Sequence, residues 1–299
     1  MPCISRLMIS RALDRSGPIL VTGATGKVGS HLVPRLLALG LQVRALVRPG
    51  PNVQKLRDQG AEIVEGDLLR AGTLDRALKG AETVVHLAAF FRGATPEQAR
   101  EVNLVGTEQL AAAAQLAGVK NFIFTSTSNV YRAGLNRPGR EDDSPGPAPP
   151  SHPYPASKVA AEAMLMELDR ETGMGLCILR LGFVYGEGDR HVWEMMPHVS
   201  GWNPARRMHS VHHADVGQAI IRALDRGTRG GKVYNIADDA PITLLELTRL
   251  AREQEPSPDR FTVPFDPWEG LMDTRRAREE LGFRPIYPSC YAAADAGAF

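Results

Sequence analysis

Short runs of β-branched and aliphatic residues alternate with amphipathic stretches along most of the chain, from Ile19 onward. In residues 27–39 the apolar positions recur every three or four residues, which predicts a helix with one buried face. Regular alternation of this kind favours an α/β fold, in which helices cover both faces of a doubly wound parallel sheet. The predicted strands are 19–22, 42–47, 61–64, 83–87, 121–124, 176–181 and 232–236, and the predicted helices are 27–39, 96–117, 153–168, 214–224, 244–252 and 273–281.

The composition is that of an ordinary globular protein. Of 299 residues, 43% are hydrophobic and 23% are charged, which excludes disorder as the main state. The net charge of +1 lacks the basic excess of a nucleic-acid binder, and no apolar run approaches the ~20 residues of a membrane span. Cys3, Cys177 and Cys290 are far apart and odd in number, so we predict neither a disulfide framework nor a metal site. Because arginines interrupt the apolar residues near the start, we expect a cytoplasmic protein.

A glycine-rich segment follows the first predicted strand. Residues 22–29 read TGATGKVG, with Gly23, Gly26 and Gly29 at the spacing GxxGxxG. Glycines let a backbone turn tightly and approach a pyrophosphate, whose charge then lies at the N-terminus of the next helix. Because the motif follows a strand and opens an amphipathic helix, it predicts dinucleotide binding.

The end of the second predicted strand indicates which dinucleotide is bound. An acidic residue there would favour NAD, but this chain has Arg48, with Arg44 four residues earlier. A guanidinium suits the 2′-phosphate of NADP, which is therefore favoured over NAD. The alternative is that Arg48 is only a solvated surface charge.

Two further patterns carry candidate chemistry. Tyr154 and Lys158 form YxxxK near the start of a predicted helix, so that both side chains share one helical face. A nearby ammonium would lower the pKa of the phenol and let Tyr154 act as general acid or base. Hydroxyl side chains at 125–128 follow the fifth strand, where ligands bind in α/β sheets, although a turn that caps its own backbone is an alternative.

The organisation changes after Gly186, where the alternation of strands and helices weakens. We expect a smaller, mostly helical lobe that contacts substrate. The Pro- and Gly-rich stretch 132–153 is expected to be an ordered loop beside the site rather than a linker. The predicted division is an N-terminal extension 1–17, a dinucleotide-binding domain 18–182 rejoined by about 214–237, and a substrate lobe of 183–213 and 238–299.

Taken together, the motifs resemble the extended short-chain dehydrogenase/reductases of the NAD-dependent epimerase/dehydratase type. In order along 18–285 they are TGATGKVG, Asp67, HLAA at 86–89, Asn103, FTSTSNVY, YPASK, RLGFVYG, VHHADV, YNIA and LGFRP. The resemblance implies a Rossmann-type sheet and a catalytic set in which Thr127 orients substrate, Tyr154 is the acid/base and Lys158 holds the nicotinamide ribose. It leaves His86 as a buried strand residue rather than a second acid/base.

The resemblance also implies two larger sets of binding residues. The cofactor-binding residues would be Gly23, Thr25, Gly26, Lys27, Val28, Gly29, Arg48, Asp67, Leu68, Leu87, Ala88, Ala89, Thr125, Tyr154, Lys158, Leu181, Gly182 and Val184. The substrate-binding residues would be Thr127, Ser128 and Phe183.

At two places the chain differs from the residues that subgroups of this family carry. Dehydratases place an Asp-Glu pair after the catalytic hydroxyl, where this chain has Ser128 and Asn129. Enzymes acting on sugar nucleotides place an Asn where this chain has Phe183, which would shape a more apolar pocket. Arg206 and Arg207 could grip a diphosphate, but surface arginines are the commoner case.

These observations favour an enzyme, an NADP-linked oxidoreductase that transfers hydride between the cofactor and a small carbonyl or alcohol. The alternatives are a nucleotide-sugar epimerase with retained NAD and a non-catalytic regulator that binds NAD(P). The expected partner is a small-molecule substrate. A homodimer through the predicted helices 96–117 and 154–168 is compatible with the apolar residues of those stretches.

Overall fold

The computed structural model describes residues 17–50, 53–91, 93, 95–146, 153–226 and 230–299. The predicted N-terminal extension, apart from Gly17, and the end of the 132–153 loop lie outside these residues. The described residues fall into two compact units. The first unit draws on Met1–Ser126, Ala148–Leu179 and Ala219–Val233, and the second on Thr127–Pro147, Arg180–Gln218 and Tyr234–Phe299. The domain division predicted above stays a prediction, and each unit is described by itself.

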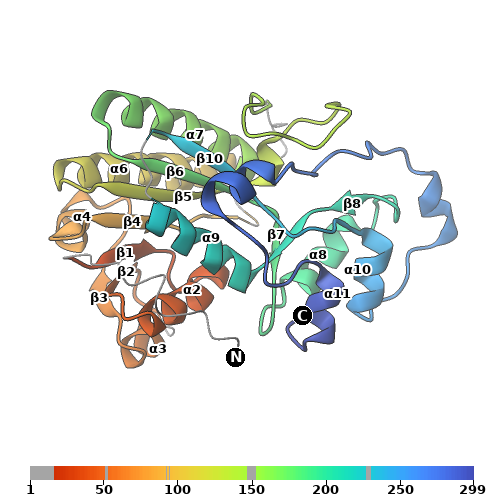
Figure 1. The fold of residues 1–299 in the computed structure, drawn as a ribbon, viewed down its shortest axis with the longest axis horizontal. Helices are drawn as coiled ribbons and strands as arrows, with labels where there is room; N and C mark the ends of the chain where they lie inside the picture. The colour runs from red at the N-terminus through yellow and green to blue at the C-terminus, as the bar shows by residue number, and fades with distance from the viewer. Residues whose placement is uncertain (1–16, 51–52, 92, 94, 147–152, 227–229) are drawn as a thin grey trace. The chain divides into compact units, whose positions relative to one another are not determined.

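The first unit is built on a parallel sheet, drawn in Figure 1. The sheet has seven strands in the order β10-β6-β5-β4-β1-β2-β3. The order reverses between β1 and β4, which is where ligands bind in doubly wound sheets. The predicted Rossmann-type fold is therefore confirmed. The strands are β1 (Ile19–Thr22), β2 (Val43–Val47), β3 (Glu62–Glu65), β4 (Thr83–His86), β5 (Asn121–Thr127), β6 (Leu176–Leu181) and β10 (Lys232–Ile236).

The register of the sheet brings distant strand ends together. Strand β1 pairs in parallel with both β2 and β4, and Thr22 lies opposite Leu46 on one side and His86 on the other. Strand β5 continues this alignment, with His86 opposite Phe124. The last residues of β1 and β4 are thus neighbours, although more than sixty residues separate them along the chain.

The predicted helices are present with some changes in their bounds, and two helices, α3 (Val53–Asp58) and α4 (Ala71–Leu78), were not predicted. The predicted helix 96–117 is interrupted by a π-helical turn, and β5 extends three residues beyond its predicted end. The helices are α2 (Lys27–Ala38), α3 (Val53–Asp58), α4 (Ala71–Leu78), α5 (Pro96–Arg100), the π-helical turn η1 (Glu101–Val105), α6 (Gly106–Leu116), α7 (Pro153–Thr172) and α9 (His213–Arg226).

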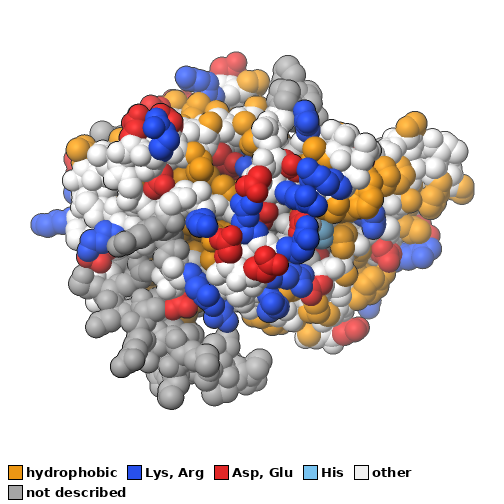
Figure 2. All heavy atoms as spheres, turned by 45° about the horizontal axis from the view of Figure 1, so that its top comes forward, with side chains coloured by type: hydrophobic (Ala, Val, Ile, Leu, Met, Phe, Trp, Pro, Cys, Tyr) orange, Lys and Arg blue, Asp and Glu red, His pale blue; other side chains and the backbone are white. Residues whose placement is uncertain are grey.

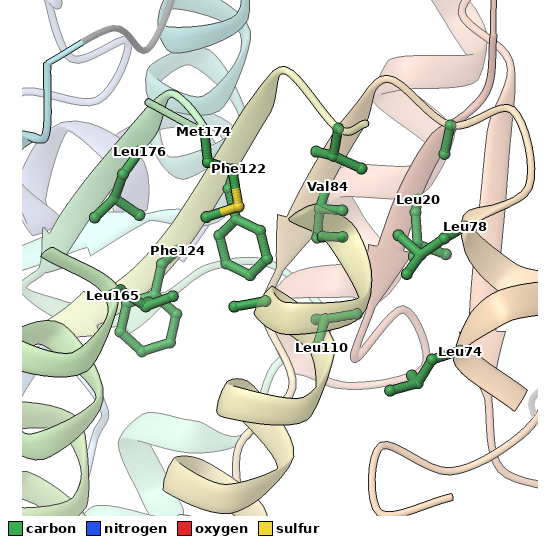
Figure 3. Packing of buried hydrophobic residues seen from close by; sticks show 14 of the residues in the cluster. Leu20, Leu74, Leu78, Val84, Leu110, Phe122, Phe124, Leu165, Met174 and Leu176 are labelled. Carbon is green, nitrogen blue, oxygen red and sulfur yellow. The ribbon is translucent and has the colours of Figure 1, made fainter. Parts of the chain in front are cut away.

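The core of the first unit lies between one face of the sheet and three helices, as Figure 3 shows. Phe122 and Phe124 of β5 both point to this face because alternate residues of a strand share a side. Helix α2 contacts β1 and β2, yet its buried residues lie outside this cluster, which places α2 on the opposite face. The cluster includes Leu20 and Val84 from strands, Leu74 and Leu78 from α4, Leu110 from α6 and Leu165 from α7.

The second unit has short strands and several helices, which agrees with the expected mostly helical lobe. Strand β7 (Phe183–Tyr185) pairs in parallel with β9 (Ser210–His212), and β8 (Arg207–Met208) pairs antiparallel with β11 (Ile242–Thr243). The helices are α8 (His191–Val199), α10 (Leu244–Leu250), α11 (Cys290–Asp295), the 3-10 turns η2 (Ser128–Val130) and η3 (Pro258–Thr262), and the π-helical turn η4 (Ala277–Leu281).

The predicted helix 273–281 is shorter than expected. Its first residue instead forms a turn, because the carboxylate of Asp273 accepts a hydrogen bond of 3.1 Å from the backbone N–H of Arg275. Cys177 and Cys290 are buried free thiols. None of the helices in the described residues has the length and apolar character needed to cross a membrane.

Candidate active site

Gly23 is required by the backbone at the end of β1. Its φ of +69° lies in the left-handed region, and a Cβ there would come within 2.6 Å of the backbone nitrogen of Ala88. Gly29 meets a similar limit from within the turn, since its Cβ would lie 2.2 Å from the carbonyl oxygen of Gly23. Gly23 therefore allows the turn between β1 and α2 to pack closely against the chain that leaves β4, and Gly29 allows the turn to pack against its own backbone.

The N-terminus of α2 is open to an anion. Gly26 is its N-cap residue, no side chain caps the helix, and the first turn contains no acidic residue. A Cβ at Gly26 would meet only the Gly23 carbonyl, at 3.2 Å. Thr25, Gly26 and Lys27 are exposed. Unsatisfied backbone N–H groups at a helix N-terminus bind phosphate, so these residues fit the pyrophosphate of a dinucleotide.

Arg44 within β2 and Arg48 just after it have different environments. Arg48 is exposed where β2 ends. Arg44 instead donates hydrogen bonds of 2.9 and 2.6 Å to the carbonyls of Ala77 and Lys79, and its guanidinium lies 2.8 Å from the carboxylate of Glu62. Arg44 therefore stabilises the edge of the sheet, and the argument for NADP rests on Arg48 alone.

Asp67 and Leu68 form the loop after β3. One carboxylate oxygen of Asp67 accepts a hydrogen bond of 3.0 Å from the N–H of Leu69, and the backbone of Asp67 is bound by the Thr73 hydroxyl. Leu68 is buried against the core. The loop is thus held by its own hydrogen bonds, which presents Asp67 half-buried at the end of the strand.

Tyr154 and Lys158 lie on the first turns of α7. Lys158 is only 1% exposed, and its ammonium donates a hydrogen bond of 2.9 Å to the carbonyl of Thr125 in β5. The same nitrogen lies 4.3 Å from the centroid of the Phe124 ring and 5.9 Å from that of Tyr154. The i,i+4 spacing predicted from sequence therefore brings the two side chains together, with Lys158 anchored on the central sheet.

Burial controls the protonation of both groups. It lowers the pKa of Lys158 to about 7, against a smaller opposing effect of the Glu162 carboxylate. It raises the pKa of Tyr154 above its ordinary value. The expectation that Lys158 lowers the phenol pKa was wrong for this structure, because desolvation dominates where no hydrogen bond or close charge favours the phenolate.

His86 is a structural residue. It is fully buried, its Nδ1 lies 2.6 Å from the Thr22 hydroxyl, and its Nε2 lies 2.8 Å from the Thr107 hydroxyl. The Thr107 hydroxyl donates to the carbonyl of Asn103, so it must accept from Nε2–H, which leaves Nδ1 to accept from Thr22. The backbone N–H of Ala88 completes this chain by donating to Thr22. The neutral tautomer is therefore specified by its partners.

The pKa of His86 supports the same conclusion. Burial, helped by the charge of Lys158, lowers it to about 3. An imidazole that stays neutral at physiological pH and has both nitrogens bonded cannot serve as a proton donor in catalysis. The prediction that His86 is a buried strand residue is confirmed.

Asn103 connects the chain after β4 to the helix that carries Tyr154. Its Oδ1 accepts from the N–H of Phe90 at 2.7 Å, and its Nδ2 donates to the carbonyl of Phe90 and to the Ser157 hydroxyl, both at 3.0 Å. Ser157 in turn donates to the carbonyl of Tyr154. The sequence marked Asn103 only as part of a motif. Its placement depends on the π-helical turn η1, which local periodicity does not reveal.

An aromatic residue beside Tyr154 was also missed by the sequence analysis. The ring of Phe91 packs edge-on against that of Tyr154, with centroids 4.7 Å apart and an interplanar angle of 78°. Phe91 follows Leu87, Ala88 and Ala89, which the sequence assigned to the cofactor. Because these residues become steadily more exposed beyond β4, the segment leads from the core to the surface near Tyr154.

In the second unit, Thr127 ends β5 and caps the following turn. Its hydroxyl accepts a hydrogen bond of 3.2 Å from the N–H of Asn129. Thr127 and Ser128 are each 8% exposed. Thr125 and Thr127 share one side of the strand because they are two residues apart. The catalytic role of Thr127 stays a prediction.

Residues 181–184 pack closely within the second unit. Gly182 is buried where a Cβ would lie 2.8 Å from the carbonyl of His209. The half-buried ring of Phe183 stacks on His191, with centroids 4.4 Å apart. His191 donates from Nδ1 to the carbonyl of Val184, and its backbone N–H is bound by Asp189. The stack orients Phe183, although its contact with substrate is untested, as are those of Leu181 and Val184 with the cofactor.

A charged hollow of about 220 Å³ also lies in the second unit. Its arginines face carboxylates: Arg275 lies 2.6 Å from Asp273, and Arg276 pairs with Asp142. On the face drawn in Figure 2, acidic side chains likewise stand among the basic ones. Because the positive charges are already neutralised, the hollow does not favour an anionic ligand. The described residues contain no group of His, Cys, Asp and Glu arranged to hold a metal ion.

Comparison with known proteins agrees with this geometry. A 4-hydroxy-2-methyl-3-oxo-4-farnesyl-3,4-dihydroquinoline-1-oxide ketoreductase from Stigmatella aurantiaca is 30% identical, over 92% of this chain and 83% of its own length. A 3 beta-hydroxysteroid dehydrogenase/Delta 5-->4-isomerase from Mycobacterium tuberculosis is 31% identical, over 79% and 69%. A UDP-glucose 4-epimerase from Vibrio cholerae is 30% identical, over 79% and 76%.

A solved structure extends the likeness to the fold. MoeE5 in complex with UDP-glucuronic acid and NAD superposes with a TM-score of 0.72 at 28% identity, covering 94% of this chain and 97% of the other. The sequence model of the NAD dependent epimerase/dehydratase family matches residues 19–237, which hold the glycine turn, Tyr154 and Lys158. The chain is therefore an enzyme of the NAD dependent epimerase/dehydratase family.

Proposed function

We propose that this enzyme is an NADP-linked oxidoreductase that interconverts a small carbonyl compound and its alcohol. The observation that carries the proposal is the placement of Tyr154 and Lys158, one helical turn apart on α7, with Lys158 hydrogen-bonded to Thr125 at the carboxyl end of a central strand. Ligands of doubly wound sheets bind at this end of the strands. Two of the curated relatives are named as a ketoreductase and a hydroxysteroid dehydrogenase, which supports the same chemistry.

In this proposal the residues of the chain handle the proton and hold the reactants. The dinucleotide supplies or accepts the hydride when it is bound. Tyr154 gives its phenolic proton to the oxygen of the carbonyl compound during reduction and takes it back during oxidation. Lys158 holds the nicotinamide ribose, while Thr127 orients the substrate oxygen.

Substitution of Tyr154 tests the catalytic part of the proposal. Tyr154→Phe removes the phenolic oxygen and keeps the ring, so we expect NADP binding to persist while turnover of every substrate falls by about 10²-fold or more. Tyr291→Phe makes the same change at an exposed residue and should leave turnover unchanged. If wild type turns over a substrate and Tyr154→Phe does so at the same rate, Tyr154 is not the acid/base.

The preference for NADP rests on exposed Arg48 at the end of β2. Calorimetric titration of the purified protein with NADP and with NAD measures the preference directly. We expect NADP to bind more tightly, and Arg48→Ala to weaken NADP by about tenfold while NAD changes little. Arg222→Ala, at an exposed position of α9, is the control. Equal affinity of the wild-type protein for both dinucleotides would show that Arg48 does not select NADP.

A nucleotide-sugar epimerase with retained NAD is the second candidate, favoured by the relative from Vibrio cholerae. Absorbance of the freshly purified protein separates the two, because an epimerase returns its hydride in each cycle and needs no cofactor exchange. NAD carried through purification would favour the epimerase. The homodimer and the cytoplasmic location stay predictions, and light scattering after size-exclusion chromatography measures the oligomeric state.

A further inference from the structure

We infer that Phe91 determines substrate specificity: its ring forms an apolar wall beside Tyr154, and it selects carbonyl compounds that carry an apolar ring or chain next to the reacting carbon. The inference rests on the proposed function, since it takes Tyr154 as the group that bonds to the substrate oxygen. It goes beyond that function by naming the substrate class and the residue that selects it.

The first support is the distance between the two rings. The centroids of Phe91 and Tyr154 lie 4.7 Å apart, with the planes at 78°. A substrate oxygen that accepts the proton of Tyr154 must come within about 3 Å of the phenolic oxygen. Its carbonyl carbon then lies about one bond further away, so a substituent of more than a few atoms on the Phe91 side of the carbonyl contacts that ring.

The second support is that Phe91 is held in place. The preceding residue, Phe90, is bound through both its N–H and its carbonyl by the buried side chain of Asn103, at 2.7 and 3.0 Å. The same amide of Asn103 bonds to Ser157, which bonds to the carbonyl of Tyr154. The backbone at Phe90 and the backbone at Tyr154 are therefore tied through one side chain, which holds the segment that carries Phe91 beside Tyr154.

The third support is the exposure of the aromatic pair. Phe90 is 36% and Phe91 is 42% exposed, so both phenyl rings are partly in water, and that of Phe91 packs against Tyr154. Covering such surface with an apolar group is favourable, and a phenyl ring offers no hydrogen bond to a sugar hydroxyl. The pair therefore favours an apolar substrate over a polyhydroxylated one.

The experiment compares two ketones that differ in apolar size. Decalone, a fused-ring ketone, and butanone are reduced with NADPH or NADH by wild type, Phe91→Ala and Phe91→Leu. We expect Phe91→Ala to lower kcat/KM for decalone by about tenfold or more, mainly by raising KM. The kcat/KM for butanone should change less than about twofold. Phe91→Leu should keep most of the wild-type kcat/KM for decalone, because leucine also presents an apolar side chain. Phe261→Ala, at a phenylalanine that is 48% exposed, is the matched control and should behave as wild type.

A binding measurement makes the result independent of turnover. Calorimetric titration of decalone into wild type and Phe91→Ala, each saturated with NADP, should give a Kd at least about tenfold weaker for the variant. Decalone that binds in this Phe91-dependent way but is not reduced would overturn the proposed oxidoreductase and leave the inference standing. Equal effects on both ketones, equal Kd values for wild type and variant, or no binding of decalone to wild type would overturn the inference itself.

Discussion

The ammonium of Lys158 donates a hydrogen bond of 2.9 Å to the carbonyl of Thr125, which ties the helix of the YxxxK motif to the central strand β5. Burial lowers the pKa of Lys158 to about 7, while the Glu162 carboxylate acts to raise it. Lys158 is therefore a cation below about pH 7 and increasingly neutral above it. The residue proposed to hold the ribose thus titrates within the physiological range.

This titration predicts a pH dependence of cofactor binding. We expect the affinity for NADP to fall as the pH rises through about 7, measured by calorimetry between about pH 6 and pH 9. Glu162→Gln removes the charge that favours the ammonium and should move the midpoint to lower pH. Glu167→Gln, an exposed position on the same helix, should leave the midpoint where it is. An affinity that is flat across this range would contradict the role of the Lys158 charge.

Gly23 is predicted to be far less tolerant of a side chain than another glycine of similar conformation. Gly23→Ala and Gly40→Ala both place alanine at positive φ, +69° and +79°, but only the first meets backbone atoms of Leu87 and Ala88. Gly40→Ala should cost about 1–2 kcal/mol in the free energy of unfolding, from conformation alone. Gly23→Ala should cost more and weaken NADP binding at least tenfold. Urea unfolding and calorimetry check both, and equal losses in the two variants would contradict the close-approach argument.

The clamp made by Asn103 predicts a loss of stability when its amide is removed. Asn103→Leu conserves size but leaves the N–H and carbonyl of Phe90 and the Ser157 hydroxyl without their partner, so we expect a loss of about 2–5 kcal/mol in urea unfolding. Thr107→Val, one helical turn away, removes the bond to His86 and leaves the clamp intact. It should cost less than Asn103→Leu and leave the KM for decalone unchanged. If Thr107→Val lost more free energy of unfolding than Asn103→Leu, the hydrogen bonds of Asn103 would not be the main stabilising contribution of this turn.

Asp238 predicts an unusual dependence of stability on pH. Burial raises its pKa to about 8, so the folded protein holds this proton more tightly than the unfolded chain. Its contribution to stability is fully present below the unfolded pKa of about 4 and is lost as the pH rises through about 8. Asp238→Asn stays neutral throughout, so we expect it to exceed wild type in the free energy of unfolding by about 1 kcal/mol or more near pH 8.

The neighbouring acid provides the comparison for Asp238. Asp239 is a surface group paired with Arg278, so Asp239→Asn should lower stability slightly and equally from about pH 5 to pH 8. Thermal unfolding of the two variants across this range measures the difference. A constant gap between Asp238→Asn and wild type would show that the Asp238 carboxyl does not titrate as expected.

Features that depend on neighbours along the chain were predictable from sequence. Strands β1, β6 and β10 have their predicted bounds, and the glycine spacing predicted the turn that Gly23 and Gly29 make. The apolar period of 27–39 predicted α2 to within one residue. These elements depend on periodicity and on the backbone freedom of glycine, both of which are local properties.

Other features were missed because they depend on residues far apart. The helix 96–117 contains a π-helical turn that directs Asn103 inward, toward Phe90 and Ser157. The guanidinium of Arg44, four residues before Arg48, donates its hydrogen bonds to the carbonyls of Ala77 and Lys79. Neither result follows from spacing, because each depends on which surfaces meet after folding.

The sequence by itself therefore determined the architecture, the glycine turn and the pairing of Tyr154 with Lys158, since an i,i+4 spacing on a helix brings side chains together wherever the helix lies. Only the tertiary structure decided the charge states of these groups and which side chains pack against them. It made His86 neutral, lowered the pKa of Lys158 and set Phe91 against Tyr154. The reason is that desolvation and ring packing depend on the elements that close over a residue, and those elements come from distant parts of the chain.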